Sequence, residues 1–215
     1  MHLVGNLFEA TLLVAAALFP IVNPLGSSLI FLGLTGGYAH PVRASLARRI
    51  SLNSFLLLFA SMVIGSKVLA FFDISLPVVQ VGGGLVVIAM GWNMLQQKDG
   101  DPQRVALNPA DASQQAFYPL TLPLTVGPGS ISVAVALGAN AQRQMYGWPA
   151  QLASTFLGPL VIALSVYICY RSAERLEKLL GATGLSVFIR LSSFIVLCIG
   201  IQIFWNGLAA LAHLP

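Results

Sequence analysis

Long stretches without a charged side chain constrain this chain more than any other feature. The first runs from Thr11 to Val42 and contains no Asp, Glu, Lys or Arg. An α-helix needs about 20 apolar residues to cross the hydrocarbon core of a bilayer. Only 8% of the 215 residues are charged and 57% are hydrophobic, with a mean hydropathy of +0.83. Soluble domains carry far more charge, so the sequence predicts an integral membrane protein.

Charged and turn-forming residues divide the chain into six expected membrane spans. The spans that follow the first stretch cover residues 50–70, 76–95, 117–139, 150–170 and 185–211. The segment 96–115 is the only long hydrophilic stretch, and it predicts a linker between two halves, residues 1–95 and 116–215. Each half then has three spans. Because three is odd, the second half must enter the membrane with inverted orientation.

The distribution of Lys and Arg predicts the orientation. Eight of them follow the first, third and fifth spans: Arg43, Arg48, Arg49, Lys98, Arg104, Arg171, Arg175 and Lys178. Lys67 and Arg143 fall on the opposite side, and Arg190 lies within a span. Positive residues concentrate in cytoplasmic loops, so we expect the linker in the cytoplasm and both termini outside it. The formal net charge of +4 then reflects topology, and we expect no nucleic-acid partner.

Two similar motifs interrupt the first span of each half: FPIVNPLGS at residues 19–27 and LPLTVGPGS at residues 122–130. Proline removes a backbone donor and clashes with the preceding helical turn. A broken helix at membrane depth is tolerated only where it is buried in protein or lines a polar cavity. The motifs therefore predict two discontinuous helices that face a common site.

A broken helix exposes groups that can bind a small solute. The helix that starts after a break presents free N–H groups, which suit a carboxylate. The helix that ends before it presents free carbonyls, which suit an ammonium group, so an amino-acid zwitterion fits both. The candidate binding residues here are Asn23, Pro24, Gly26, Ser27, Thr125, Gly127, Pro128, Gly129 and Ser130. We expect a positive φ at Gly127 or Gly129. In the alternative interpretation, the prolines only kink packed helices and the hydroxyls satisfy freed backbone groups.

Arg190 is the remaining binding candidate. An arginine inside an apolar segment is costly and usually faces a cavity or a partner, so Arg190 could hold a substrate carboxylate. Alternatively, its long side chain reaches back to the cytoplasmic interface. Two further features favour helix packing: Asn53 predicts a hydrogen bond between helices, and Gly82–Gly84 predicts a close helix contact.

Several kinds of site are missing from the sequence. No Asp or Glu lies deep within a span, and no metal-ligand pair, nucleophile motif or phosphate-binding loop is present. We therefore expect no enzyme activity, metal or cofactor, while a coupling ion stays open. The expected partners are a small-molecule substrate and the lipid bilayer, and the sequence does not decide whether the chain forms a homo-oligomer.

These observations predict an all-α membrane protein of six transmembrane helices, arranged as two inverted three-helix repeats whose first helices are broken at Pro and Gly. Gln80-Val81-Gly82-Gly83 aligns weakly with Arg190-Leu191-Ser192-Ser193 between the halves. Secondary transporters have this architecture, with the substrate near the bilayer midplane. A passive channel or facilitator and a non-transporting scaffold are the alternatives.

The motifs PIVNPLG (20–26), LPLTVGPGS (122–130) and RLSSF (190–194) resemble the MarC/SnatA family of inner-membrane proteins. The resemblance covers essentially the whole chain. It implies an inner-membrane transporter of small neutral amino acids such as glycine and alanine. The sequence departs from the family at Gln80, where an arginine before Gly-Gly is usual, and this departure bears on any role for a pair of arginines.

Overall fold

The computed structural model describes residues 2–96, 112–141 and 148–212, and this part of the chain contains helices and no strand. The elements, in chain order, are α1 (His2–Val22), α2 (Pro24–Leu34), α3 (His40–Phe71), α4 (Leu76–Gln96), α5 (Ala112–Gln115), the π-helical η2 (Leu120–Thr125), α6 (Pro128–Ala141), α7 (Trp148–Arg171) and α8 (Ala173–Ala212). Most of the predicted linker, residues 97–111, lies outside the described residues.

The predicted spans correspond to α1 with α2, α3, α4, η2 with α6, α7, and α8. Five segments are long and apolar enough to cross a membrane, and Pro128–Ala139 is a shorter apolar helix. The charged residues after Arg171 extend the last helix, since α8 already begins at Ala173. Its backbone departs from helical geometry at Gly181, where φ is 64°. The all-helical membrane fold is therefore confirmed.

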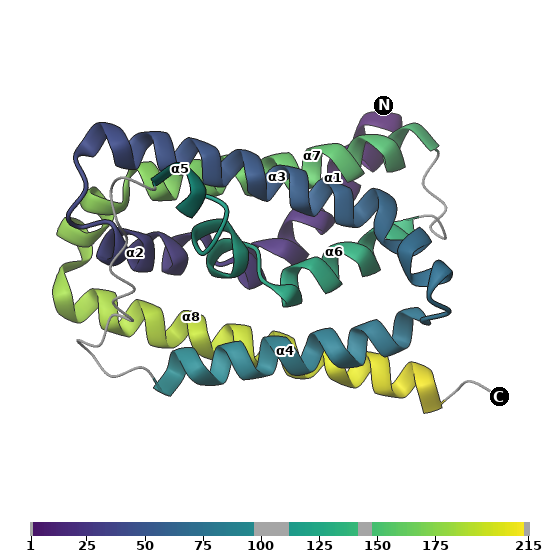
Figure 1. Cartoon of the computed structure of the whole chain (residues 1–215). Coiled ribbons are helices and arrows are strands. Elements are labelled where there is room, and N and C mark those ends of the chain that lie inside the picture. The colour runs from purple at the N-terminus through teal and green to yellow at the C-terminus, as the bar shows by residue number, and fades with distance from the viewer. Residues whose placement is uncertain (1, 97–111, 142–147, 213–215) are drawn as a thin grey trace.

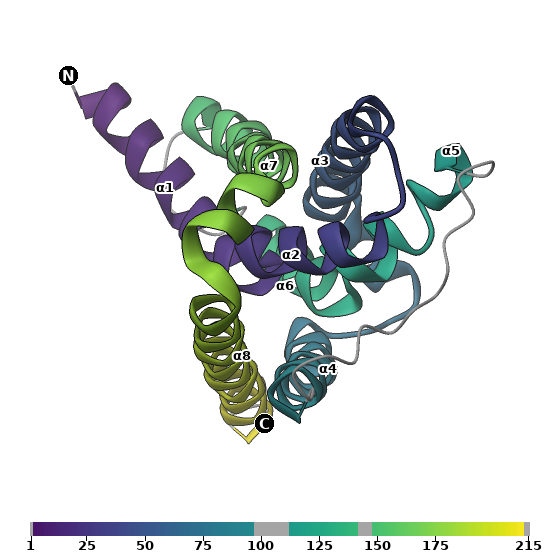
Figure 2. The same ribbon diagram turned by 90° about the vertical axis from the view of Figure 1, so that its left-hand side faces the viewer.

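The long helices run roughly along one direction, and both chain termini lie at the same end (Figure 1). We call this the terminal end, and we call the end at which α4 stops the linker end. Seen along the helices, α1, α7 and α3 form one side, α2 and α6 lie in the middle, and α4 and α8 form the other side (Figure 2). The broken segments thus occupy the centre of the molecule.

One large apolar cluster holds most of this arrangement together. Its buried members come from α1, α2, α3, η2, α6, α7 and their connections, and none comes from α4 or α8. A second cluster consists of Ile21, Val87 and Val196, and it joins α1 to α4 and α8. Large apolar side chains such as Leu52, Leu56 and Trp205 are exposed, as expected for surfaces that face lipid. The α4–α8 pair therefore lies outside the large cluster and shares buried apolar side chains with α1 through the second one.

Glycines bring α4 and α8 close together. A Cβ on Gly84 or Gly91 would lie within 2.5 or 2.7 Å of the α8 backbone, and one on Gly200 within 2.6 Å of the α4 backbone. Gly207 meets Gln80 and Val81 at 2.8 Å. Small residues allow helix backbones to approach in this way within membranes. The predicted close contact of the glycine run is confirmed for Gly84, which faces α8, and for Gly83, which faces Ser132 of α6.

Candidate functional site

The first break occurs at one residue. Helix α1 continues through Pro20 to Val22, and Asn23 then takes a left-handed conformation with φ 46° and ψ 61°. Among residues with a side chain, Asn tolerates this conformation best. Pro24 occupies the first position of α2, and the Oδ1 atom of Asn23 accepts a hydrogen bond of 3.2 Å from the Gly26 N–H. The break is thus confirmed at Asn23–Pro24, whereas Pro20 is accommodated within α1.

The amide nitrogen of Asn23 is buried without a partner. The residue is only 9% exposed, and its Nδ2 atom has no hydrogen-bond partner among the described residues. The hydroxyls of Thr11 and Ser54 share this property, but a helical hydroxyl can rotate onto the carbonyl of the preceding turn. The Asn23 amide is held by its Oδ1 bond to Gly26. Its Nδ2 donor is therefore fixed in place, and an unpaired buried donor is costly.

The second break is spread over more residues. Leu122 leaves helical geometry within η2, with φ −105° and ψ 125°. Val126 is extended, with φ −116° and ψ 91°, and α6 begins at Pro128. The expectation of a positive φ at Gly127 or Gly129 is wrong, because the only positive-φ glycine among the described residues is Gly181. The chain turns through extended residues instead, which require no glycine.

The glycines of this break instead allow α4 to approach. A Cβ on Gly129 would lie 2.3 Å from the Cγ2 atom of Val87. A Cβ on Gly127 would lie 3.2 Å from the Cε atom of Met90 and 3.3 Å from the Pro123 carbonyl oxygen. The distances show that Gly129 has no room for a side chain, while Gly127 meets the flexible end of a methionine.

The two breaks lie against each other, as the motifs predicted. The Ser27 hydroxyl is within hydrogen-bond reach of the Val22 carbonyl at 3.2 Å and of the Leu124 carbonyl, across the two breaks, at 3.4 Å. Thr125 donates to the Leu120 carbonyl at 2.7 Å, so the Tyr170 hydroxyl, also at 2.7 Å, donates to Thr125. The Tyr170 ring packs on Phe31 of α2 with centroids 4.7 Å apart.

Most hydroxyls at the breaks serve the backbone. Besides Ser27 and Thr125, Ser130 donates to the Gly127 carbonyl at 2.9 Å and Ser28 to the Leu25 carbonyl at 2.7 Å. This part of the arrangement agrees with the alternative in which hydroxyls satisfy groups freed by a kink. The Nδ2 atom of Asn23 is the polar group at the breaks that this interpretation leaves unexplained.

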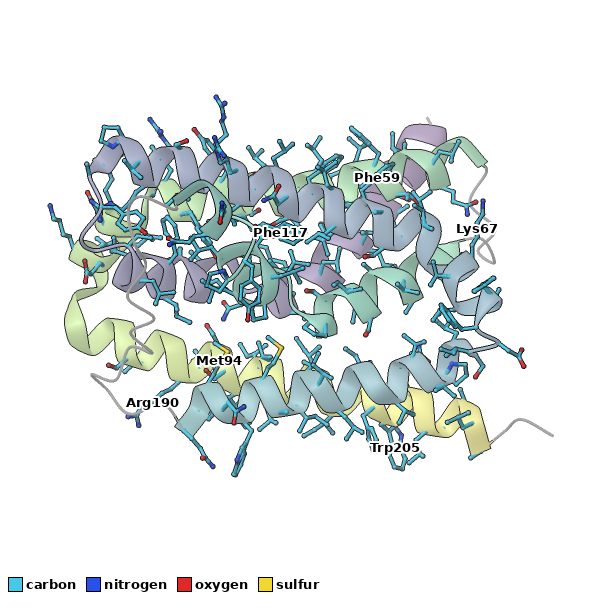
Figure 3. All side chains as sticks on the ribbon, viewed as in Figure 1. Phe59, Lys67, Met94, Phe117, Arg190 and Trp205 are labelled. Atoms are coloured by element: carbon cyan, nitrogen blue, oxygen red, sulfur yellow. The ribbon has the colours of Figure 1, made fainter. Side chains whose placement is uncertain are left out.

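Arg190 lies elsewhere. Its side chain is exposed on α8, near the linker end and pointing away from the upper helices (Figure 3). The structure therefore does not bring Arg190 together with the buried candidates at the two breaks. Asn53 of α3, by contrast, donates to the Thr121 hydroxyl of η2 at 3.4 Å, which confirms the predicted bond between helices.

Sequence reasoning missed three residues that complete the site. Tyr170 contacts both breaks, and Val87 and Met90 cover the glycines of the second. A tyrosine at the end of a span is typical of a membrane-interface anchor, so the sequence did not indicate that Tyr170 is buried. Val87 and Met90 are ordinary apolar residues of α4, and no local pattern distinguishes them from their neighbours. Among the described residues, no three His, Cys, Asp or Glu side chains gather as metal ligands would.

Comparison with known proteins shows which family this chain is related to. The model of the MarC family of integral membrane proteins matches residues 8–212. The inner membrane protein MarC of Salmonella typhimurium (strain LT2) is 29% identical over 211 residues, covering 94% of this chain and 95% of that protein. MarC of Escherichia coli (strain UTI89) is 30% identical over 212 residues, covering 94% and 96%. No solved structure matches. The chain therefore belongs to the MarC family of multi-pass inner-membrane proteins.

Proposed function

We propose that the protein is a secondary transporter of small neutral solutes, amino acids such as glycine or alanine, and that the two breaks bind the substrate. One observation carries the proposal: the Nδ2 donor of Asn23 is buried and fixed at the first break without a partner. A buried donor of this kind is costly unless a ligand uses it. The names of the relatives state a membrane location and no substrate.

The chemistry around Asn23 suits a zwitterion. A carboxylate would accept from Asn23 Nδ2 and lie near the positive ends of α2 and α6, which both begin at the breaks. The carbonyls of Val22 and Leu124, which Ser27 already approaches, would accept from an ammonium group. The buried polar side chains at the breaks are neutral, so a solute with net charge would lack a counter-charge.

The helix contacts support the inverted repeat that such transporters have. Helix α1 packs against α7 as α3 packs against α6, while α3 meets α7 and α4 meets α8. Exchange of the two halves leaves this set of contacts unchanged. Gly84 and Gly91 on α4 play the same packing role as Gly200 and Gly207 on α8, with the same spacing of seven residues. These pairs align α4 with α8 so that Gly84 corresponds to Gly200 and Gly91 to Gly207. This alignment is shifted by six residues from the one that matches Gln80 with Arg190.

The charges support an orientation with the linker end in the cytoplasm. The described Arg and Lys residues at the start of α3 and around the junction of α7 and α8 lie at this end, and Lys67 lies at the other (Figure 3). Single cysteines placed between residues 96 and 115 should then react only with an impermeant reagent in the cytoplasm. Labelling from the periplasm alone would reverse the orientation.

The proposal is tested by binding and transport of glycine with purified protein. Glycine should raise the melting temperature, and proteoliposomes should accumulate it against a gradient when a sodium or proton gradient is imposed. Asn23→Asp keeps the size and the Oδ1 acceptor but removes the Nδ2 donor, so we expect at least tenfold weaker binding in a protein that still purifies as one species. Asn93→Asp, which changes an exposed amide of α4 away from the breaks, serves as the control.

Two outcomes would replace the proposal. Glycine flux that only follows its own concentration gradient, whatever ion gradient is applied, would make the protein a passive facilitator. Absence of saturable binding by glycine and alanine, with a folded wild-type protein, would favour a scaffold in which the breaks only shape the helices.

A further inference from the structure

A cavity with three polar side chains in an otherwise apolar lining lies away from the breaks, between α4, α6 and α8. Its volume is about 150 Å³, and it is lined by Gln80, Ser132, Val133, Ala136, Leu137, Ile203 and Asn206. Gln80 is in the first turns of α4 and Asn206 is near the end of α8, so the cavity lies in the half of the molecule toward the terminal end. One water takes about 30 Å³ in the liquid, so the cavity has room for several waters or a solute of a few heavy atoms.

The cavity offers free hydrogen-bonding groups and no charge. The Gln80 side chain has no hydrogen-bond partner among the described residues. Asn206 accepts from Gln202 Nε2 at 2.8 Å through Oδ1, which leaves its Nδ2 donor available. Ser132 donates to the Pro128 carbonyl at 2.9 Å and keeps its acceptor lone pairs. Amides within an apolar span are costly where they face lipid. Water in the cavity would satisfy their hydrogen-bonding groups.

One stripe of α4 connects the cavity to the second break. Gln80 lines the cavity, and a Cβ on Gly83 would lie 2.4 Å from Ser132 Cβ. Val87 and Met90, one and two turns further, meet Gly129 and Gly127. These four positions of α4 share one face. The contact between α4 and α6 therefore runs from the cavity to the second break, and in this structure the side chains of Ser132, Val87 and Met90 fill it.

A cavity among the described residues at the linker end is much smaller. This cavity, beside Phe31 and Tyr170, measures about 10 Å³, and a single water requires about 10–15 Å³. Arg43 of α3 and Glu174 of α8 form an ion pair on its rim. Of these two cavities, the one that contains the amides of Gln80 and Asn206 is the larger.

We propose that the terminal-end cavity is a second binding site, an entry site that takes small neutral polar solutes through the amides of Gln80 and Asn206. The solute then passes to the breaks when α4 moves away from α6. The passage to the breaks rests on the transport function proposed above, whereas water access and solute contact in the cavity do not.

Access is tested by thiol labelling. Ser132→Cys is made in a Cys169→Ser, Cys198→Ser background. It should react with a membrane-impermeant, positively charged methanethiosulfonate added on the terminal side. Glycine at about 10 mM should slow that reaction. Ser165→Cys is the matched control, because Ser165 also donates to the carbonyl four residues before it, at 2.8 Å, but lies on α7 outside the cavity. No reaction at position 132, or reaction only with a membrane-soluble maleimide, would show that lipid fills the cavity and overturn the proposal.

The role in entry is tested by transport kinetics. Gln80→Leu and Asn206→Leu each remove a neutral hydrogen bond to the solute, so the KM for glycine entering from the terminal side should rise about three- to tenfold. Equilibrium binding at the breaks in detergent should stay within about twofold. Gln96→Leu, at the other end of α4, should leave KM unchanged. An unchanged KM in both cavity variants, together with glycine transport by the wild type, would refute the entry role. Absence of wild-type transport would instead contradict the function proposed above, and the labelling result would still decide whether the cavity is accessible.

Discussion

Both helix breaks interrupt a helix and turn the chain, but they do so by different physical means. At the first, one residue with φ 46° turns the chain, and its own side chain caps the next helix. At the second, the chain turns through Leu122 and Val126 in ordinary regions of φ and ψ, and its glycines are in contact with side chains of α4. The first break is therefore specified locally by Asn23, and the second depends on a neighbouring helix.

This difference predicts how each break fails. A substitution at the first break should act through the backbone and the cap of α2. A substitution at the second should act through packing with α4, and a change in α4 should compensate for it. The predictions below use this contrast, and each is measured as the free energy of unfolding in detergent together with glycine affinity.

The largest effect is expected for Asn23→Leu. A branched apolar residue in the left-handed region costs about 1–2 kcal/mol, and loss of the cap costs about 1 kcal/mol more. Asn23→Gly accepts the same backbone and lacks the side chain, so it should recover most of the backbone cost while binding of glycine stays lost. Equal stability losses in both variants would show that the left-handed backbone is not what limits this break.

Gly129→Ala should come next, with a loss of about 2 kcal/mol, because its Cβ would lie 2.3 Å from Val87 Cγ2. Val87→Ala removes the methyl groups in question, so the double variant should be more stable than the sum of the two single changes predicts. Gly127→Ala should cost less, since it meets the flexible end of Met90 at 3.2 Å. Strict additivity of Gly129→Ala and Val87→Ala would refute the dependence on α4.

Gly26→Ala should destabilise by about 1 kcal/mol, because its Cβ would lie 2.4 Å from Asn23 Nδ2 and displace the capping side chain. Glycine affinity should fall with it, since Asn23 supplies the proposed donor. Gly33→Ala is the matched control on the same helix, where a Cβ meets nothing within 4 Å. It should be neutral or slightly stabilising, because alanine favours a helix over glycine. Similar losses at positions 26 and 33 would point to helix propensity and away from the cap.

The smallest effect is expected for Tyr170→Phe. The change removes one neutral hydrogen bond, the 2.7 Å bond to Thr125, and keeps the ring contact with Phe31, so stability should fall by about 0.5 kcal/mol. Thr125→Val removes this bond and also the 2.7 Å bond to the Leu120 carbonyl, so it should cost more than Tyr170→Phe. It should cost less in the Tyr170→Phe background than in the wild type, because one of its two bonds is already gone there. Independent, additive losses would mean that this pair does not link α7 to the second break.

The sequence by itself determined the membrane fold and the positions of the breaks. Uncharged stretches of span length predict helices that cross the bilayer, because the bilayer interior offers no hydrogen-bond partners to backbone N–H and C=O groups. Proline acts on its own turn, so the break at Asn23–Pro24 and the start of α6 at Pro128 were both predictable. Asn53 was also recognised, since a lone amide in a span seeks a partner on another helix.

Only the tertiary structure decided how the breaks are held and what surrounds them. It placed Val87 and Met90 over the second break, buried Tyr170 between α2 and η2, and left Arg190 exposed on α8. It also kept Pro20 within α1 and gave Gly127 and Gly129 a packing role in place of a positive φ. These outcomes depend on which helices become neighbours, and neighbours are chosen by side-chain packing between segments far apart in the chain, which no local pattern records.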